Sequence, residues 1–181
     1  MNYDDFLKSK AIHAIDSGFD TDDLNENLFD YQRAIVKWAL KKGRCAIFED
    51  TGLGKTIQQL AWADCVGKHT NGKVLILSPL AVSKQTAKES KRFGIECKIV
   101  ESQEDLIEGI NITNYEKLHK FEDVSFSGIV LDESSVMKNY LGKTTRQILE
   151  RFRKTPYKLC CTATPSPNDF QEIGSTAEFL G

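Results

Sequence analysis

Phe48-Glu49-Asp50-Thr51-Gly52-Leu53-Gly54-Lys55-Thr56 joins a short apolar run to a helical pattern through a turn that contains two glycines. Residues 45–48 are apolar and predict a buried strand, whereas the pattern from residue 55 onward predicts a helix. Gly52 and Gly54 permit backbone angles and close approaches that side chains prevent. A strand, a glycine turn and a helix start are typical of a phosphate-binding loop, in which backbone N–H groups surround the anion. This stretch therefore predicts a phosphate site within an α/β fold.

The side chains of this loop predict a site for a nucleotide and Mg²⁺. Lys55 would reach the β- and γ-phosphate oxygens, and the Thr56 hydroxyl would bind Mg²⁺. Glu49 departs from the general pattern, which has a glycine at that position. A glycine turn before an ordinary amphipathic helix is the alternative, and the downstream motifs make it less favourable. The predicted nucleotide-binding residues of the loop are Thr51, Gly52, Leu53, Gly54, Lys55 and Thr56.

The composition predicts one globular domain. The chain has 181 residues, of which 40% are hydrophobic and 28% are charged, a balance typical of soluble proteins that bury a full core. No stretch approaches roughly eighteen consecutive apolar residues, and the N-terminus lacks the pattern of a secretory signal. The five cysteines lack metal-ligand spacing and are expected to be reduced. We therefore expect a cytoplasmic protein without a membrane partner. A formal net charge of −2 argues against a basic nucleic-acid surface over the whole domain but leaves a local one open.

Apolar runs alternate with helical patterns along the chain. Strands are predicted at residues 45–48, 74–77, 97–100, 110–113, 128–131 and 158–161, and helices at 55–67, 83–93 and 144–153. Short apolar strands separated by helices predict a mostly parallel central sheet with helices on both faces. Ligands of such sheets bind at the carboxyl ends of the strands. We expect one domain over residues 28–181, preceded by a helical N-terminal extension at residues 1–27.

A second motif, Ile129-Val130-Leu131-Asp132-Glu133-Ser134-Ser135, places two carboxylates at the end of an apolar strand. Asp132 would hold Mg²⁺ through its water shell, and Glu133 would orient or deprotonate a water that attacks the γ-phosphate. A strand that ends in a solvated acidic turn is the alternative. The phosphate loop in the same β/α pattern favours the catalytic interpretation.

Three motifs together resemble those of superfamily 2 helicases and translocases. Asp50-Thr51-Gly52-Leu53-Gly54-Lys55-Thr56, Asp132-Glu133-Ser134-Ser135 and Thr162-Ala163-Thr164-Pro165 are similar to motifs I, II and III of that superfamily. The Gly-Leu-Gly-Lys-Thr form followed by Gln58, and the run Leu28-Phe29-Asp30-Tyr31-Gln32-Arg33, resemble the Swi/Snf-type branch. The runs at residues 38–44 and 162–169 most resemble phage and prophage DEAD/DEAH-box helicases, although motif II ends in Ser-Ser rather than Ala-His.

The resemblance implies a RecA-like P-loop NTPase domain that uses ATP and Mg²⁺. Gln32 would recognise adenine, because its amide offers both donors and an acceptor; a surface glutamine on the first turn of a helix is the alternative. Thr162 and Thr164 would couple the γ-phosphate to movement on DNA. The implied catalytic residues are Lys55, Asp132 and Glu133, and the implied Mg²⁺ ligands are Thr56 and Asp132. Contacts to the DNA phosphate backbone would come from the loops around residues 79–80 and 113–114, and from Lys138, Asn139 and Lys143.

Motors of this superfamily have a second RecA-like domain, which supplies an arginine to the ATP site, and no such domain follows Thr164 in this sequence. We therefore expect the missing C-terminal RecA-like domain to be a partner, and the chain alone to be weakly active or inactive as an ATPase. The expected function is the ATP-binding motor domain of an ATP-dependent DNA helicase or translocase, in a bacterial host cell if the gene comes from a phage or prophage.

Three other functions remain open. The chain could be the duplex DNA translocase of a restriction or repair complex, a nucleotide-dependent scaffold or regulatory module, or a P-loop kinase. Glu133 argues against a pure binding module, which needs no carboxylate to activate water. The run at residues 162–165 has no role in a kinase.

Overall fold

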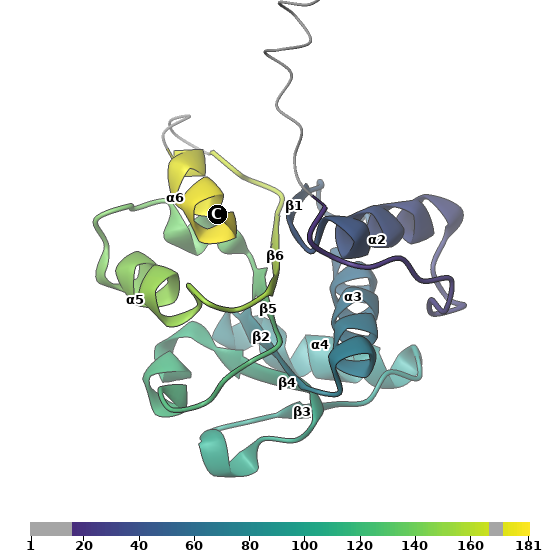
Figure 1. Ribbon diagram of the computed structural model, residues 1–181, viewed down its shortest axis with the longest axis horizontal. Helices are drawn as coiled ribbons and strands as arrows, with labels where there is room; N and C mark the ends of the chain where they lie inside the picture. Colours follow the sequence, from purple (N-terminus) through teal and green to yellow (C-terminus); the bar gives the residue numbers. More distant parts are fainter. Residues whose placement is uncertain (1–15, 167–171) are drawn as a thin grey trace, which may run out of the picture.

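The computed structural model describes residues 16–166 and 172–181 and contains a six-stranded parallel sheet (Figure 1). The strands lie in the order β1-β6-β5-β2-β4-β3, and each pairs in parallel with its neighbours. The predicted parallel sheet is confirmed. The bounds of the strands are β1 Arg44–Phe48, β2 Lys73–Ser78, β3 Cys97–Ile99, β4 Gly109–Asn114, β5 Gly128–Asp132 and β6 Tyr157–Thr162.

Successive side chains of the central strands enter two hydrophobic clusters, one on each face of the sheet. In β5, Val130 belongs to one cluster, whereas Ile129 and Leu131 belong to the other. In β2, Ile76 and Leu75 divide in the same way. Because side chains alternate across a strand, a strand that is covered on both faces is apolar at successive positions. The continuous apolar runs in the sequence follow from this arrangement.

Helices cover both faces of the sheet (Figure 1). One face carries α2 Asp30–Lys42, α3 Lys55–Thr70 and α4 Leu80–Arg92, and the other carries α5 Lys143–Arg151 and α6 Glu172–Leu180. Three short 3-10 helices lie in the described part of the chain after β3, β4 and β5: η1 Gln103–Asp105, η2 Tyr115–Phe121 and η3 Ser134–Met137. The predicted helices on both faces are confirmed.

All strands end at the same edge of the sheet, because all are parallel. Phe48 of β1 pairs with Thr162 of β6, and Asp132 of β5 pairs with Cys161. The phosphate loop that follows β1 therefore lies close to the ends of β6 and β5. The ends of β2 and β4 continue this edge on the other side of β5.

The prediction of a helical extension is wrong for its described part. Residues 16–29 contain bends and turns and no helix. The backbone N–H of Phe19 donates to the Leu40 carbonyl oxygen at 3.1 Å, so this segment is attached to the end of α2. Side chains compete for the backbone N–H groups here, since Asn25 Oδ1 accepts from the N–H of Asn27 at 3.0 Å. Residues 1–15 lie outside the described residues.

Several elements differ from the prediction or were not predicted. The helix predicted at 83–93 begins three residues earlier, directly after Pro79. The 3-10 helices and α6 were not predicted, and residues 167–169 of the predicted phage-type run lie outside the described residues. Within residues 16–166 and 172–181, every helix is too short or too polar to cross a membrane.

Candidate functional site

The phosphate loop has two glycines in the left-handed backbone region. The φ angle is 84° at Gly52 and 80° at Gly54. Gly54 directly precedes α3, and a Cβ atom at this position would lie 2.3 Å from Nε2 of Gln32. Gly54 is therefore required by its backbone angle and by the close approach of Gln32. The first N–H groups of α3 have no acceptor within the helix, an arrangement that favours an anion.

Lys55 and Glu49 stabilise the loop from within. Lys55 Nζ donates to the backbone oxygens of Glu49 at 2.8 Å and Asp50 at 2.9 Å. The Glu49 carboxylate accepts a 2.7 Å hydrogen bond from Nε2 of Gln58, in the first turn of α3. Glu49 thus has a structural contact at the position where the general motif has glycine. The ammonium group of Lys55 can exchange its carbonyl partners for phosphate oxygens, which are stronger acceptors.

Gln32 is buried against the loop, so the interpretation as a surface glutamine is wrong. Its exposed fraction is 3%. Its Oε1 accepts from the backbone N–H of Phe29 at 3.0 Å, and its Nε2 donates to the backbone oxygen of Leu53 at 3.0 Å. The Tyr31 hydroxyl donates to the same oxygen at 2.9 Å. These bonds attach α2 to the phosphate loop, and adenine recognition by Gln32 stays a prediction.

Asp132 ends β5 and contacts the first turns of α3. Its Oδ1 accepts a 2.8 Å hydrogen bond from Nε2 of Gln59. Burial raises the pKa of Asp132, and the negative charge of Glu133 adds to this rise. The hydrogen bond from Gln59 and the positive charge of Lys55 both oppose it. The ammonium group of Lys55 is therefore close enough to influence the carboxylate.

The residues at this edge fit a Mg²⁺ ion. Asp132 offers a carboxylate and Thr56 a hydroxyl, and both are oxygen ligands of the kind that Mg²⁺ prefers. The described residues contain no cluster of three or more His, Cys, Asp or Glu side chains that could hold a metal. Mg²⁺ needs no such cluster, because it is usually held by one or two carboxylates together with substrate phosphates.

Glu133 adopts a left-handed backbone conformation with a φ of 58°. Its Oε1 accepts hydrogen bonds from Thr162 Oγ1 at 2.5 Å and from Ser135 Oγ at 2.7 Å. The backbone N–H of Thr164 donates to Thr162 Oγ1 at 3.0 Å. The structure therefore brings motif II and motif III into direct contact, and the carboxylate of Glu133 is the shared acceptor.

The model of the SNF2-related domain matches residues 31–181. The chain belongs to this family. Among curated relatives, it is 32% identical over 183 residues to the helicase SWR1 of Eremothecium gossypii, with 87% of this chain and 12% of that protein covered. It is 30% identical over 179 residues to the chromodomain-helicase-DNA-binding protein 1-like of Danio rerio, with 85% of this chain and 17% of that protein covered. The SNF2-related domain described here thus spans less than a fifth of the length of either relative.

Solved structures match the fold. The SWI2/SNF2 ATPase core domain of Sulfolobus solfataricus has a TM-score of 0.73 and 26% identity, with 96% of this chain and 38% of that chain covered. The same core in complex with double-stranded DNA has a TM-score of 0.74 and 24% identity, with 93% of this chain and 38% of that chain covered. The expectation of a RecA-like fold is confirmed.

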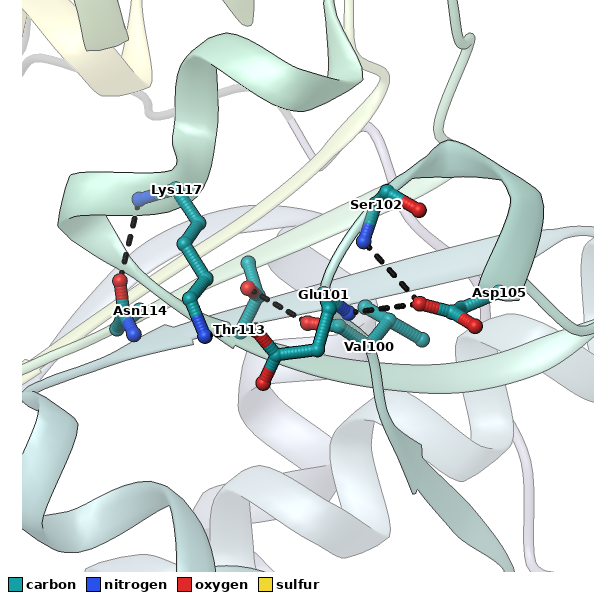
Figure 2. Close-up of polar contacts among 7 residues, drawn as sticks. All are labelled: Val100, Glu101, Ser102, Asp105, Thr113, Asn114 and Lys117. Atoms are coloured by element: carbon teal, nitrogen blue, oxygen red, sulfur yellow. Dashed lines mark hydrogen bonds and ion pairs between the residues drawn. The ribbon is translucent and has the colours of Figure 1, made fainter.

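In this SNF2-related domain, the segment after β4 is attached to Asp132. The Tyr115 hydroxyl donates to the backbone oxygen of Asp132 at 2.7 Å. Burial raises the pKa of Tyr115 well above its ordinary value, and the charge of Asp132 adds to this effect. Neighbouring residues hold the segment: Asn114 Oδ1 accepts from the backbone N–H of Lys117 at 3.1 Å (Figure 2). The side chain of Lys117 also forms an ion pair with Glu101.

The residues predicted to contact DNA divide into two groups. Thr113 is buried and donates to the backbone oxygen of Val100 at 2.9 Å (Figure 2), and Asn114 is used to begin η2. These two side chains shape the loop, and the predicted contact of this loop with DNA stays a prediction. A cavity of about 490 Å³ opens beside them, and it is lined by Pro79, Leu80, Tyr115, Glu133 and Lys138 among others. Asn139 and Lys143, which follow Lys138 in the sequence, are exposed.

The sequence analysis missed Gln59 and Tyr115. Gln59 lies three residues after Thr56, a spacing that places both side chains on one face of a helix. Tyr115 directly follows residues 113–114, which were predicted to lie at the end of a strand and to contact DNA. Both positions carried a signal, but neither identified the partner, because Asp132 is distant in the sequence.

Proposed function

We propose that the chain is the ATP-binding motor domain of an ATP-dependent DNA translocase or helicase. The proposal rests on one arrangement: the loop of Lys55, the Asp132 carboxylate and the Glu133 carboxylate meet at one edge of a parallel sheet. Membership of the SNF2-related family and the relatives named as helicases support it.

In the proposed mechanism, the loop and the start of α3 bind the phosphates through backbone N–H groups. Lys55 leaves the carbonyl oxygens of Glu49 and Asp50 and binds the β- and γ-phosphate oxygens. Thr56 and Asp132 would hold Mg²⁺, which would neutralise charge on the phosphates. Glu133 orients the attacking water and accepts its proton.

Thr162 supplies the proposed link to movement. Its hydroxyl is hydrogen-bonded to Glu133, and the backbone of Thr164 is bonded to that hydroxyl. When the carboxylate of Glu133 turns to a water beside the γ-phosphate, the hydrogen bond that it accepts from Thr162 must break, and Thr162 must find another partner. The segment after β6 thereby responds to the state of the nucleotide.

The whole protein is proposed to contain more than this domain. A second RecA-like domain that completes the site is proposed from the superfamily resemblance; the chain covers 17% and 12% of the two curated relatives and 38% of the archaeal core. An arginine from such a domain is typically worth about 10³–10⁵ in rate, so the chain alone should turn over ATP slowly. DNA is the proposed partner, supported by the archaeal core whose structure contains double-stranded DNA. A cytoplasmic location and a phage or prophage origin stay predictions; the sequence relatives described above are eukaryotic.

Of the two alternatives, Glu133 separates only the scaffold from this function. A scaffold or regulatory module would bind ATP without using the bond between Glu133 and Thr162, whereas a motor would lose turnover without the carboxylate. A duplex DNA translocase of a restriction or repair complex would use the same site, and it differs only in leaving the strands paired.

The test is ATP hydrolysis by the full-length protein with duplex DNA, single-stranded DNA or RNA as activator. Glu133→Gln should preserve ATP binding and lower the stimulated rate by about 10²-fold or more, because the base is lost while the shape remains. Glu150→Gln, which changes an exposed residue of α5, is the matched control and should hydrolyse ATP normally. Hydrolysis by Glu133→Gln at the wild-type rate would exclude the catalytic role and favour the scaffold.

A further inference from the structure

Gln59 connects α3, the helix that follows the phosphate loop, to Asp132. It is in the second turn of α3, and its exposed fraction is 1%. Its Nε2 donates to Oδ1 of Asp132 at 2.8 Å. A carboxylate that receives a fixed donor on one oxygen has a restricted orientation, and its other oxygen faces elsewhere. Gln59 therefore fixes the orientation in which the Asp132 carboxylate meets a ligand.

The other end of the Gln59 amide has no partner among the described residues. Oε1 is buried and accepts no hydrogen bond within the protein. A buried acceptor without a donor destabilises the folded state, and native proteins rarely leave one unused. Mg²⁺ keeps several of its waters when it binds to proteins, and those waters are strong donors. An acceptor beside the carboxylate that binds the ion is placed to receive one of them.

We propose that Gln59 is a positioning residue for the Mg²⁺ that accompanies the nucleotide. Its NH₂ group holds Asp132, and its Oε1 accepts a hydrogen bond from a water of the ion. The inference rests on the proposed function, because it assumes that Asp132 and Thr56 bind Mg²⁺. It adds a residue that acts on the ion through another ligand, as partners of metal ligands commonly do.

Gln58 provides a matched comparison within the same helix. It is equally buried and also has an Oε1 without a partner in the described chain, but its Nε2 donates to Glu49 at 2.7 Å and to the Leu53 oxygen at 3.4 Å. Gln58 thus contacts the loop, whereas Gln59 contacts Asp132. The two residues should affect nucleotide binding in different ways.

The experiment measures binding of a fluorescent ATP analogue to the chain while MgCl₂ is titrated, so that it needs no turnover. Gln59→Met keeps the length of the side chain and removes both hydrogen-bonding groups. The Mg²⁺ midpoint should rise by about 10–100-fold, the usual effect of removing a partner of a metal ligand. Binding in the presence of EDTA should stay unchanged. Gln58→Met should weaken binding to the same degree with and without Mg²⁺, and its Mg²⁺ midpoint should equal that of the wild type.

A Mg²⁺ midpoint for Gln59→Met within about twofold of the wild type would overturn the inference while leaving ATP binding intact. An equal shift in Gln58→Met would also overturn it, because the effect would then be a general loosening of α3. If the wild type binds no nucleotide, both the inference and the proposed function fail. Circular dichroism checks folding, and Gln59→Asn, whose amide is too short to reach Asp132, replaces Gln59→Met if that variant is unfolded. In the background of Asp132→Asn, loss of the Gln59 amide should have little further effect on the midpoint, since the two residues act together.

Discussion

Glu133 and Gly54 both have left-handed backbone angles, but only Glu133 carries a side chain there. Such a conformation costs about 1–3 kcal/mol in a residue other than glycine, and it persists where the surroundings fix it. The hydrogen bonds from Thr162 and Ser135 fix Glu133. At residue scale, the site combines a glutamate with a strained backbone, Glu133, and a glycine, Gly54, whose missing side chain leaves room for Gln32.

Gly54→Ala should lower the free energy of unfolding by about 1–2 kcal/mol, because alanine disfavours the left-handed region. The new methyl group would also displace the amide of Gln32 from the Leu53 oxygen, so nucleotide binding should be lost. Gly174→Ala is the control. It lies within α6 with open space around it, and it should leave stability unchanged or raise it by up to about 1 kcal/mol. Chemical denaturation measures both variants; a Gly54→Ala protein as stable as the wild type would contradict the strain argument.

At element scale, η2 follows the end of β4 in the chain and is hydrogen-bonded to the end of β5. Asn114 begins this 3-10 helix, and Tyr115 reaches the backbone of Asp132. The preceding loop is held in place by Asp105, whose Oδ2 accepts from the backbone N–H groups of Glu101 at 3.1 Å and Ser102 at 3.2 Å (Figure 2). The edge of the sheet is thus held by hydrogen bonds within the loop before β4 and between η2 and the end of β5.

Tyr115→Phe removes the hydroxyl that donates to the backbone oxygen of Asp132, so this oxygen loses that hydrogen bond. We expect the free energy of unfolding to fall by about 1–2 kcal/mol, the cost of a buried polar group that loses its partner. Tyr140→Phe, at a ring that is 51% exposed, should change stability by less than about 0.5 kcal/mol. Equal effects of the two substitutions in urea denaturation would show that the bond from Tyr115 contributes nothing.

Lys158 connects β6 to α6 and makes stability depend on pH. Its Nζ donates to the backbone oxygen of Phe179 at 2.7 Å. Burial, with a contribution from Arg44, lowers the pKa of Lys158 below the usual 10.5. The folded protein then binds this proton less tightly than the unfolded chain, so the contribution of Lys158 to stability rises as pH increases through the lowered pKa towards 10.5.

Thermal unfolding of the wild type and Lys158→Met at a series of alkaline pH values tests this dependence. The stability of the wild type relative to Lys158→Met should increase as the pH rises in that window. Lys154→Met, at an exposed position, should show a constant difference from the wild type. A wild type that loses stability relative to Lys158→Met over the same window would give the opposite sign and contradict the burial of the charged group.

At the scale of the whole molecule, the sheet gathers residues that are far apart in the sequence. The order of the strands brings the loop after β1 beside the ends of β6 and β5, and it puts β2 and β4 beyond them. Because every strand runs in the same direction, the catalytic candidates, the motif III threonines and the cavity beside Tyr115 all lie at one edge.

The sequence was sufficient to predict the strands and the phosphate loop, since local apolar runs and glycines determine them. The runs around Ile76 and Val130 are apolar throughout because both faces are buried. The contact between Gln59 and Asp132 could not be predicted, because it depends on the order of the strands and joins residues 73 positions apart. The helix α6 contains Gly174, which disfavours helices, and it depends on Phe179 packing into the core.

The central claim is that Lys55 and its loop bind ATP together with Mg²⁺. The most direct measurement is the shift in the thermal unfolding temperature of the chain when ATP and MgCl₂ are added, compared between the wild type and Lys55→Ala. The account predicts a clear rise in the wild type, because a ligand that binds only the folded state stabilises it. It predicts little or no rise in Lys55→Ala, which lacks the ammonium group that binds the phosphates. Equal shifts in the two proteins would contradict the account.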